Sequence, residues 1–177
     1  MTRMIFGYGT AAGGLVVAGI IIGLALGTDG GSGGLMIGYL IMLVAFSLIF
    51  VAVKRYRDVE QGGVIRFSTA FGLGMGIAGV ASAVYVIGWE GYLWSSNYTF
   101  IDDYAQATLA AKTSEGASAS EIAALTQSLN DMRSLYDQPL LRMGVTFLEI
   151  LPVGLVVSLI AAALLRNSRF LPARTAR

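Results

Sequence analysis

Residues 67–89 read FSTAFGLGMGIAGVASAVYVIGW and contain no charged side chain. An α-helix rises about 1.5 Å per residue, so roughly 20 apolar residues cross a hydrocarbon core of about 30 Å. The stretch lacks the alternation of apolar and polar residues that marks a strand of a membrane barrel. It therefore predicts a membrane-spanning helix.

Three further stretches repeat this pattern. Residues 4–28 and 30–53 are uncharged, and Glu149 is the one charged residue in 143–165. We expect an all-α membrane protein, a four-helix bundle whose spans lie at about residues 4–27, 34–54, 66–94 and 140–165 of a single membrane domain, 1–177. A cleaved signal peptide is the alternative for the first stretch, which is longer than the apolar part of most signal peptides.

The composition limits the possible chemistry. Of 177 residues, 55% are hydrophobic and 13% charged, which excludes a water-soluble globular domain. The chain has no His and no Cys, so it offers no imidazole base, no thiolate and no Cys/His zinc site. We expect no metal, no cofactor and no enzymatic activity.

The basic residues predict the orientation. Nine of the 12 Lys and Arg residues fall on one side of the membrane if the spans alternate: Arg3, Lys54, Arg55, Arg57, Arg66, Arg166, Arg169, Arg174 and Arg177. The positive-inside rule makes that side cytoplasmic, which places both termini inside and predicts an inner-membrane protein. The other side receives a Gly-rich turn around residues 28–33 and a long acidic segment, which argues against nucleic-acid binding.

The outer segment, about residues 95–138, is long enough to have its own helices. We expect a first helix over about residues 98–111 and a second that begins at Ser118. Ser118 and Glu121 have the spacing of a capping box, and apolar residues then recur at helical intervals to Tyr136. Two interpretations stay open: a cap that binds an unknown protein partner, or a lid that buries its own apolar stripe.

Glycines inside the spans predict close helix packing, because they let helix backbones approach in lipid. In the third span Gly72 and Gly76 are four residues apart, and Gly79 follows. The same signature would serve a homo-oligomer, which we keep as the alternative. Pro152 is the one proline inside a span and should kink or loosen the fourth helix.

Glu149 is the side chain most able to carry chemistry. It lies roughly 12 Å below the outer hydrocarbon surface at 1.5 Å per residue, where a carboxylate must be protonated or paired. We therefore expect it to face the bundle interior. Matched depth suggests Tyr85, Ser82 and Tyr39 as hydrogen-bond partners, and Arg142 as a cation that could reach it. The alternatives are a coupling carboxylate of a transporter and a structural carboxyl beside the Pro152 kink.

The loop from Lys54 to Gly63 has two interpretations. Its basic residues could bind anionic lipid head groups. The simpler one is a tight turn that obeys the orientation rule, with Gly62 and Gly63 supplying the bend.

Two blocks carry a family resemblance. The first contains Tyr56-Arg57-Asp58 and Gly62-Gly63, and the second is Phe147-Leu148-Glu149-Ile150-Leu151-Pro152-Val153-Gly154. Together they resemble the bacterial integral-membrane family catalogued as domain of unknown function forty-one ninety-nine, from about Met4 to Arg166. The resemblance implies a small four-span inner-membrane protein in contact with the lipid bilayer and carries no activity with it.

We therefore expect a non-enzymatic structural, assembly or envelope-associated protein. The alternative is a small oligomeric secondary transporter or ion pathway that uses Glu149 as its coupling carboxylate.

Overall fold

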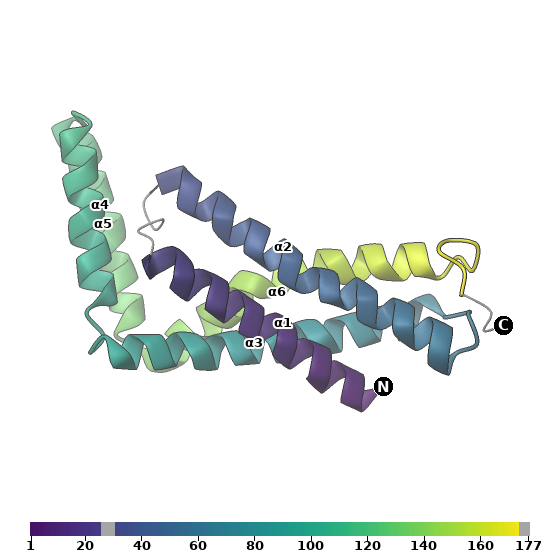
Figure 1. Cartoon of the computed structure of the whole chain (residues 1–177). Coiled ribbons are helices and arrows are strands. Elements are labelled where there is room, and N and C mark those ends of the chain that lie inside the picture. The colour runs from purple at the N-terminus through teal and green to yellow at the C-terminus, as the bar shows by residue number, and fades with distance from the viewer. Residues whose placement is uncertain (26–30, 174–177) are drawn as a thin grey trace. The chain divides into compact units, whose positions relative to one another are not determined.

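The computed structural model describes residues 1–25 and 31–173 of the chain. Within these residues, six α-helices follow one another: α1 (Thr2–Ala25), α2 (Gly31–Arg55), α3 (Phe67–Ser95), α4 (Phe100–Ser114), α5 (Ala119–Tyr136) and α6 (Pro139–Leu165) (Figure 1). A π-helical turn, η1 (Tyr56–Glu60), continues α2. The described residues contain no strand, so the protein is all-α.

In the described part of the chain, four helices are long and apolar enough to cross a membrane, as expected for a membrane protein. They cover Thr2–Ala25, Met36–Glu60, Phe67–Ser95 and Pro139–Leu165. The second span is longer than the predicted 34–54, because the chain stays helical through the basic residues and into η1. Of the predicted outer turn around residues 28–33, residues 28–30 lie outside the described part of the chain, as do Arg174 and Arg177.

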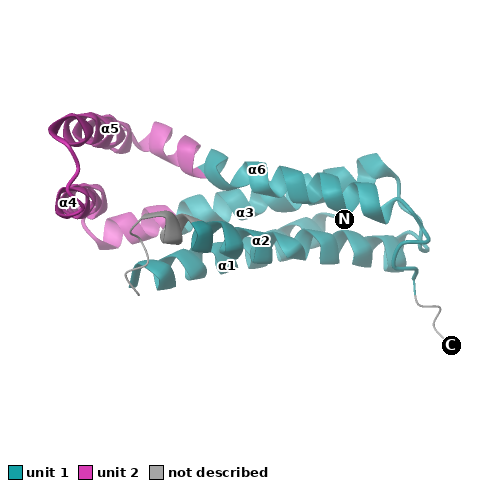
Figure 2. Cartoon of the chain, turned by 90° about the horizontal axis from the view of Figure 1, so that it is seen from above, with its two compact units in different colours: residues 1–88, 147–177 teal, residues 89–146 magenta. Residues whose placement is uncertain are grey.

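The chain divides into two compact units (Figure 2). Unit 1 comprises residues 1–88 and 147–177, and unit 2 comprises residues 89–146. Unit 1 contains α1, α2, η1, most of α3 and most of α6, which run side by side in Figure 2. Its core includes fully buried apolar side chains from α1, α2, α3 and α6, among them Val16, Phe46, Ile49, Leu73, Ile77 and Ile150.

Glycines allow the helices of unit 1 to approach closely. A Cβ added at Gly13 of α1 would lie 2.7 Å from the carbonyl oxygen of Ala81 in α3. One added at Gly154 of α6 would lie 2.6 Å from the Cβ of Ala78. Real Cβ atoms do not come so near. The helices can therefore pack this closely only because both positions are glycine.

Helix α6 runs through Pro152 without interruption and begins at Pro139. Proline costs little in the first turn of a helix, since the N–H that it lacks has no partner there. Pro139 is therefore well suited to the first position of α6.

Unit 2 contains the α4–α5 hairpin with the end of α3 and the start of α6. Gly116 turns the chain between α4 and α5 at a φ of +79°, which glycine adopts without strain. The predicted capping box is present: the Ser118 side chain accepts from the Glu121 N–H, and the Glu121 carboxylate accepts from the Ser118 N–H. Ile101, Ala105 and Leu129 are buried in this unit.

Candidate functional site

Polar side chains gather at three places in the described chain: around Glu149, around Arg142 and around Arg57. The first and third belong to unit 1 and the second to unit 2. Each is described by itself.

Glu149 is exposed on the surface of α6 and does not face the bundle interior as expected. Tyr85 of α3, which is buried, donates a hydrogen bond from its hydroxyl to Glu149 Oε2 at 3.3 Å. This is the only hydrogen bond to Glu149 among the described residues. The helical register explains the exposure, because Ile150 occupies the buried side of α6 and its neighbour points about 100° away.

Within the described residues, the other predicted hydrogen-bond partners, Ser82 and Tyr39, do not bond to Glu149. Ser82 is buried and donates to the carbonyl of Ala78 in its own helix, 3.0 Å away. Tyr39 lies on α2 with 58% of its surface exposed. Comparing the depths of residues in neighbouring spans thus identified Tyr85 correctly as a partner of Glu149. Depth alone does not say which way a side chain points around its helix.

Arg142 binds Glu90. Its Nε donates to Glu90 Oε1 and its Nη2 to Glu90 Oε2, each at 2.7 Å, in a two-pronged ion pair. Its Nη1 donates to the backbone carbonyl of Tyr136, and its guanidinium carbon lies 5.2 Å from the centre of the Tyr98 ring. The structure therefore places the cation expected near Glu149 in a network that joins α3, α5 and α6 within unit 2.

The sequence alone did not predict the pair of Arg142 and Glu90. Trp89 and Tyr92 stack beside it, with ring centres 5.4 Å apart. One sequence signal could have indicated the pair: Glu90 lies near the end of the third span and Arg142 near the start of the fourth.

Arg57 is fully buried, although the sequence suggested only a tight turn here. Its Nη1 donates to the carbonyl of Phe170 at 2.9 Å and to that of Leu165 at 3.4 Å, and its Nη2 donates to that of Leu171. Leu165 ends α6, so the guanidinium caps a helix C-terminus, where carbonyls lack partners and a cation is favoured.

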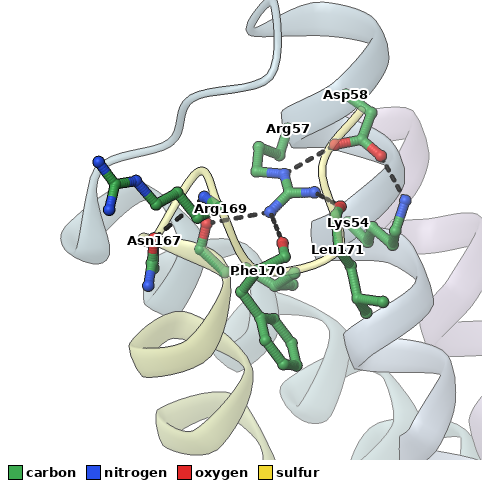
Figure 3. A network of polar contacts seen from close by, with 8 residues as sticks. Lys54, Arg57, Asp58, Asn167, Arg169, Phe170 and Leu171 are labelled. Atoms are coloured by element: carbon green, nitrogen blue, oxygen red, sulfur yellow. Dashed lines mark hydrogen bonds and ion pairs between the residues drawn. The ribbon is translucent and has the colours of Figure 1, made fainter. Parts of the chain in front are cut away.

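Asp58 balances this buried charge. Its Oδ1 accepts from Arg57 Nε at 2.7 Å and its Oδ2 accepts from Lys54 (Figure 3). The π-helical turn that carries Tyr56, Arg57 and Asp58 directs the arginine inward. Gly62 and Gly63 then reverse the chain at φ values of +63° and +91°, as the predicted turn requires.

The glycines singled out in the third span differ in their surroundings. A Cβ at Gly76 would lie 2.8 Å from the Cδ1 atom of Ile5 in α1, whereas one at Gly72 or Gly79 would meet nothing within 4 Å. The closest approaches of α3 occur instead at Gly74, beside Ser158, and at Gly88, beside Val17. Spacing of four residues locates small residues but does not say which face meets a neighbour.

Two groups of the hairpin have shifted pKa values. The hydroxyl of Ser118, together with its backbone N–H, holds the pKa of Glu121 below its ordinary value of 4.5. The hydrogen bond to Glu115 raises the pKa of Lys112. Both pairs lie at the surface and act on the local helix ends.

No three acidic side chains come together as a possible metal site in the described ranges. Among known proteins, a family model described as "Protein of unknown function (DUF4199)" matches residues 7–167. No curated protein and no solved structure matches the chain.

Proposed function

Starting from the premise that the chain belongs to the DUF4199 family of membrane proteins, we propose that it has a non-enzymatic structural or assembly role in the inner membrane. In this proposal it assembles with a second copy of itself through the face of α6 that carries Glu149. The observation that carries it is that Glu149 is an exposed residue within an apolar span.

The cost of such a carboxyl in lipid supports an interface. An acidic side chain near the centre of a spanning helix costs about 3 kcal/mol on insertion scales. The hydrogen bond from Tyr85 occupies one carboxyl oxygen. In a dimer with twofold symmetry the same surface meets itself, so two Glu149 carboxyls can share a proton across the interface.

The apolar surroundings of Glu149 fit the same role. Leu148, Val156 and Leu159 lie on the exposed side of α6, with exposed fractions of 60%, 54% and 42%. They recur along one side of the helix at intervals of eight and three residues. Such a stripe would pack against its copy while the carboxyl fixes the register.

Disulfide crosslinking tests the dimer directly, since the chain has no Cys of its own. Leu148→Cys and Val156→Cys should crosslink in native membranes, and Val44→Cys, 67% exposed on α2, should not. Adding Glu149→Leu should reduce crosslinking about fivefold, the equivalent of about 1 kcal/mol for one interhelical hydrogen bond. Glu149→Gln should retain it, because the amide still bonds. Equal crosslinking at Val44, or none at α6, would refute the dimer.

The orientation proposed here puts both termini in the cytoplasm. Contacts within unit 1 support one basic end: the Met1 ammonium lies 3.7 Å from Glu60, and Arg57 joins η1 to the end of α6. This basic end comprises the start of α1, the end of α2 with η1 and the turn that follows, and the end of α6. Among the described residues it carries Arg3, Lys54, Arg55, Arg57, Arg66, Arg166 and Arg169. The positive-inside rule assigns it to the cytoplasm.

A small transporter is the competing function. It is favoured by the same acidic residue in an apolar span, since the Glu149 carboxyl could exchange a proton or a cation if water reached it. A thermal-shift screen against ions, pH and small metabolites separates the two when run on the wild type and on Glu149→Gln. Stabilisation of the wild type alone would favour transport, and equal responses would favour the structural role.

A further inference from the structure

A groove of about 460 Å³ lies in unit 1 between the first half of α1 and the end of α2 with η1. From α1 it is lined by Met4, Gly7, Tyr8 and Ala11, which recur at the spacing of one helix face. From the other side Leu48 and Val59 complete its apolar wall. Its volume lies within the range of about 300–1,000 Å³ that is typical of ligand sites.

The groove exists because α1 and α2 meet closely only farther along. At Gly19 an added Cβ would lie 2.6 Å from Ile41 Cγ2, so the two helices are in contact there. Toward the start of α1 the small residues Gly7 and Ala11 leave the space open. A Cβ built on Gly7 meets nothing within 4 Å.

Charged side chains surround one end of the groove: Arg3, Arg55 and Glu60. Glu60 is already close to the Met1 ammonium, at 3.7 Å. Arg3 and Arg55 are exposed, and within the described residues neither guanidinium has an ion pair or a hydrogen bond. By contrast, the neighbouring Lys54 and Arg57 are both bound to Asp58. One end of the groove therefore carries the unpaired positive charges of Arg3 and Arg55, and the rest of its wall is mostly apolar.

We propose that this groove binds an anionic phospholipid. The phosphate of the head group would bind Arg3 and Arg55, and one acyl chain would lie against Gly7, Ala11 and Leu48. A phospholipid fits this combination, because the groove is formed by the membrane-spanning helices α1 and α2. Its two arginines lie at the start of α1 and at the end of α2. Basic pockets between spanning helices recognise anionic head groups in the same way.

Lipid-dependent stabilisation of the purified full chain tests the proposal. The probes are phosphatidylglycerol, phosphatidylcholine with the same acyl chains, and glycerol phosphate as a soluble head group. Each is titrated into detergent-solubilised protein, and the shift of the melting temperature is measured. Phosphatidylglycerol should stabilise the wild type, while the other two should have little effect, because one lacks net charge and the other lacks the chain.

Two kinds of variant locate the effect. Arg3→Gln and Arg55→Gln should each weaken phosphatidylglycerol binding about fivefold, which corresponds to about 1 kcal/mol per basic residue near an anionic surface. Gly7→Leu should abolish the shift by filling the groove, since its side chain enters open space. Gly14→Leu is the matched control: it adds the same side chain to the same helix, also where nothing lies within 4 Å, but outside the groove. It should behave like the wild type.

Three results would overturn the proposal. Equal stabilisation by phosphatidylcholine would show that the two arginines do not select an anionic head group. Equal stabilisation by glycerol phosphate would show that the groove does not bind an acyl chain. A full response of Gly7→Leu to phosphatidylglycerol would place the lipid elsewhere. Because the variants leave Glu149 untouched, these results are independent of the proposed dimer.

Discussion

Arg142 holds Glu90 in a two-pronged ion pair, with both nitrogen-to-oxygen distances at 2.7 Å. The two side chains are 7% and 18% exposed, so water screens the pair little. The third arm of the guanidinium holds the last carbonyl of α5, at Tyr136. One arginine thus connects the end of α3, the end of α5 and the start of α6.

Removing either partner should destabilise unit 2 strongly. Glu90→Gln and Arg142→Met should each lower the free energy of unfolding by about 3 kcal/mol, because the remaining charge stays buried without its partner. The double variant should lose clearly less than the sum, as thermal unfolding in detergent would show. Additive losses would mean that the two residues act separately. Lys112→Gln, which breaks an exposed pair with Glu115, should cause no measurable change.

The hairpin shows what local sequence predicts. Ser118 and Glu121 form their capping box because both donors and both acceptors lie within three residues. Arg142 and Glu90 are 52 residues apart, and Arg57 is 113 residues from Phe170. No local pattern encodes such a partner. The direction of a side chain around its helix, which decides the environments of Glu149, Tyr39 and Gly72, likewise depends on packing between helices.

The Glu121 carboxyl should titrate at a lower pH than an ordinary glutamate. Its pKa is depressed below 4.5 by hydrogen bonds from Ser118, so the cap stabilises α5 fully above pH 4.5. That stabilisation is lost as the pH falls through the folded-state pKa. An NMR titration of the Glu121 side chain measures it. Ser118→Ala, which removes the hydroxyl donor, should move the midpoint back up. A wild-type midpoint at the ordinary value would contradict this account.

Gly13 should tolerate a methyl group far less well than Gly72. Gly13→Ala would place its Cβ against the backbone oxygen of Ala81, which cannot move freely, and should cost about 2 kcal/mol through overpacking. Gly76→Ala should cost less, because the end of the Ile5 side chain can rotate away. Gly72→Ala meets open space and should be neutral or slightly stabilising. Equal stability of all three in thermal unfolding would show that α1 and α3 do not pack as described.

The orientation can be checked with single cysteines in a chain that has none. Glu60→Cys, at the basic end, should react with an impermeant maleimide only after the cytoplasmic side is opened. Ser114→Cys, at the end of α4, should react in intact spheroplasts, because an odd number of spans separates it from Glu60. Both positions are exposed, so accessibility is not limiting. The reverse labelling pattern would show that the protein has the opposite orientation in the membrane.

Arg57 should matter more for stability than any exposed arginine at the same end. Arg57→Ala would leave the carbonyls of Leu165, Phe170 and Leu171 without their donor and Asp58 with Lys54 alone. Loss of one member of a buried ion pair costs about 3–5 kcal/mol, so the melting temperature should fall sharply. Arg57→Lys should recover only part of the loss, because an ammonium on a flexible stem cannot reproduce the planar fork that reaches three carbonyls and Asp58. Arg166→Ala, at an exposed position one residue beyond α6, is the control and should unfold like the wild type. If Arg57→Ala also unfolded like the wild type, its burial would contribute nothing to holding η1 against the end of α6.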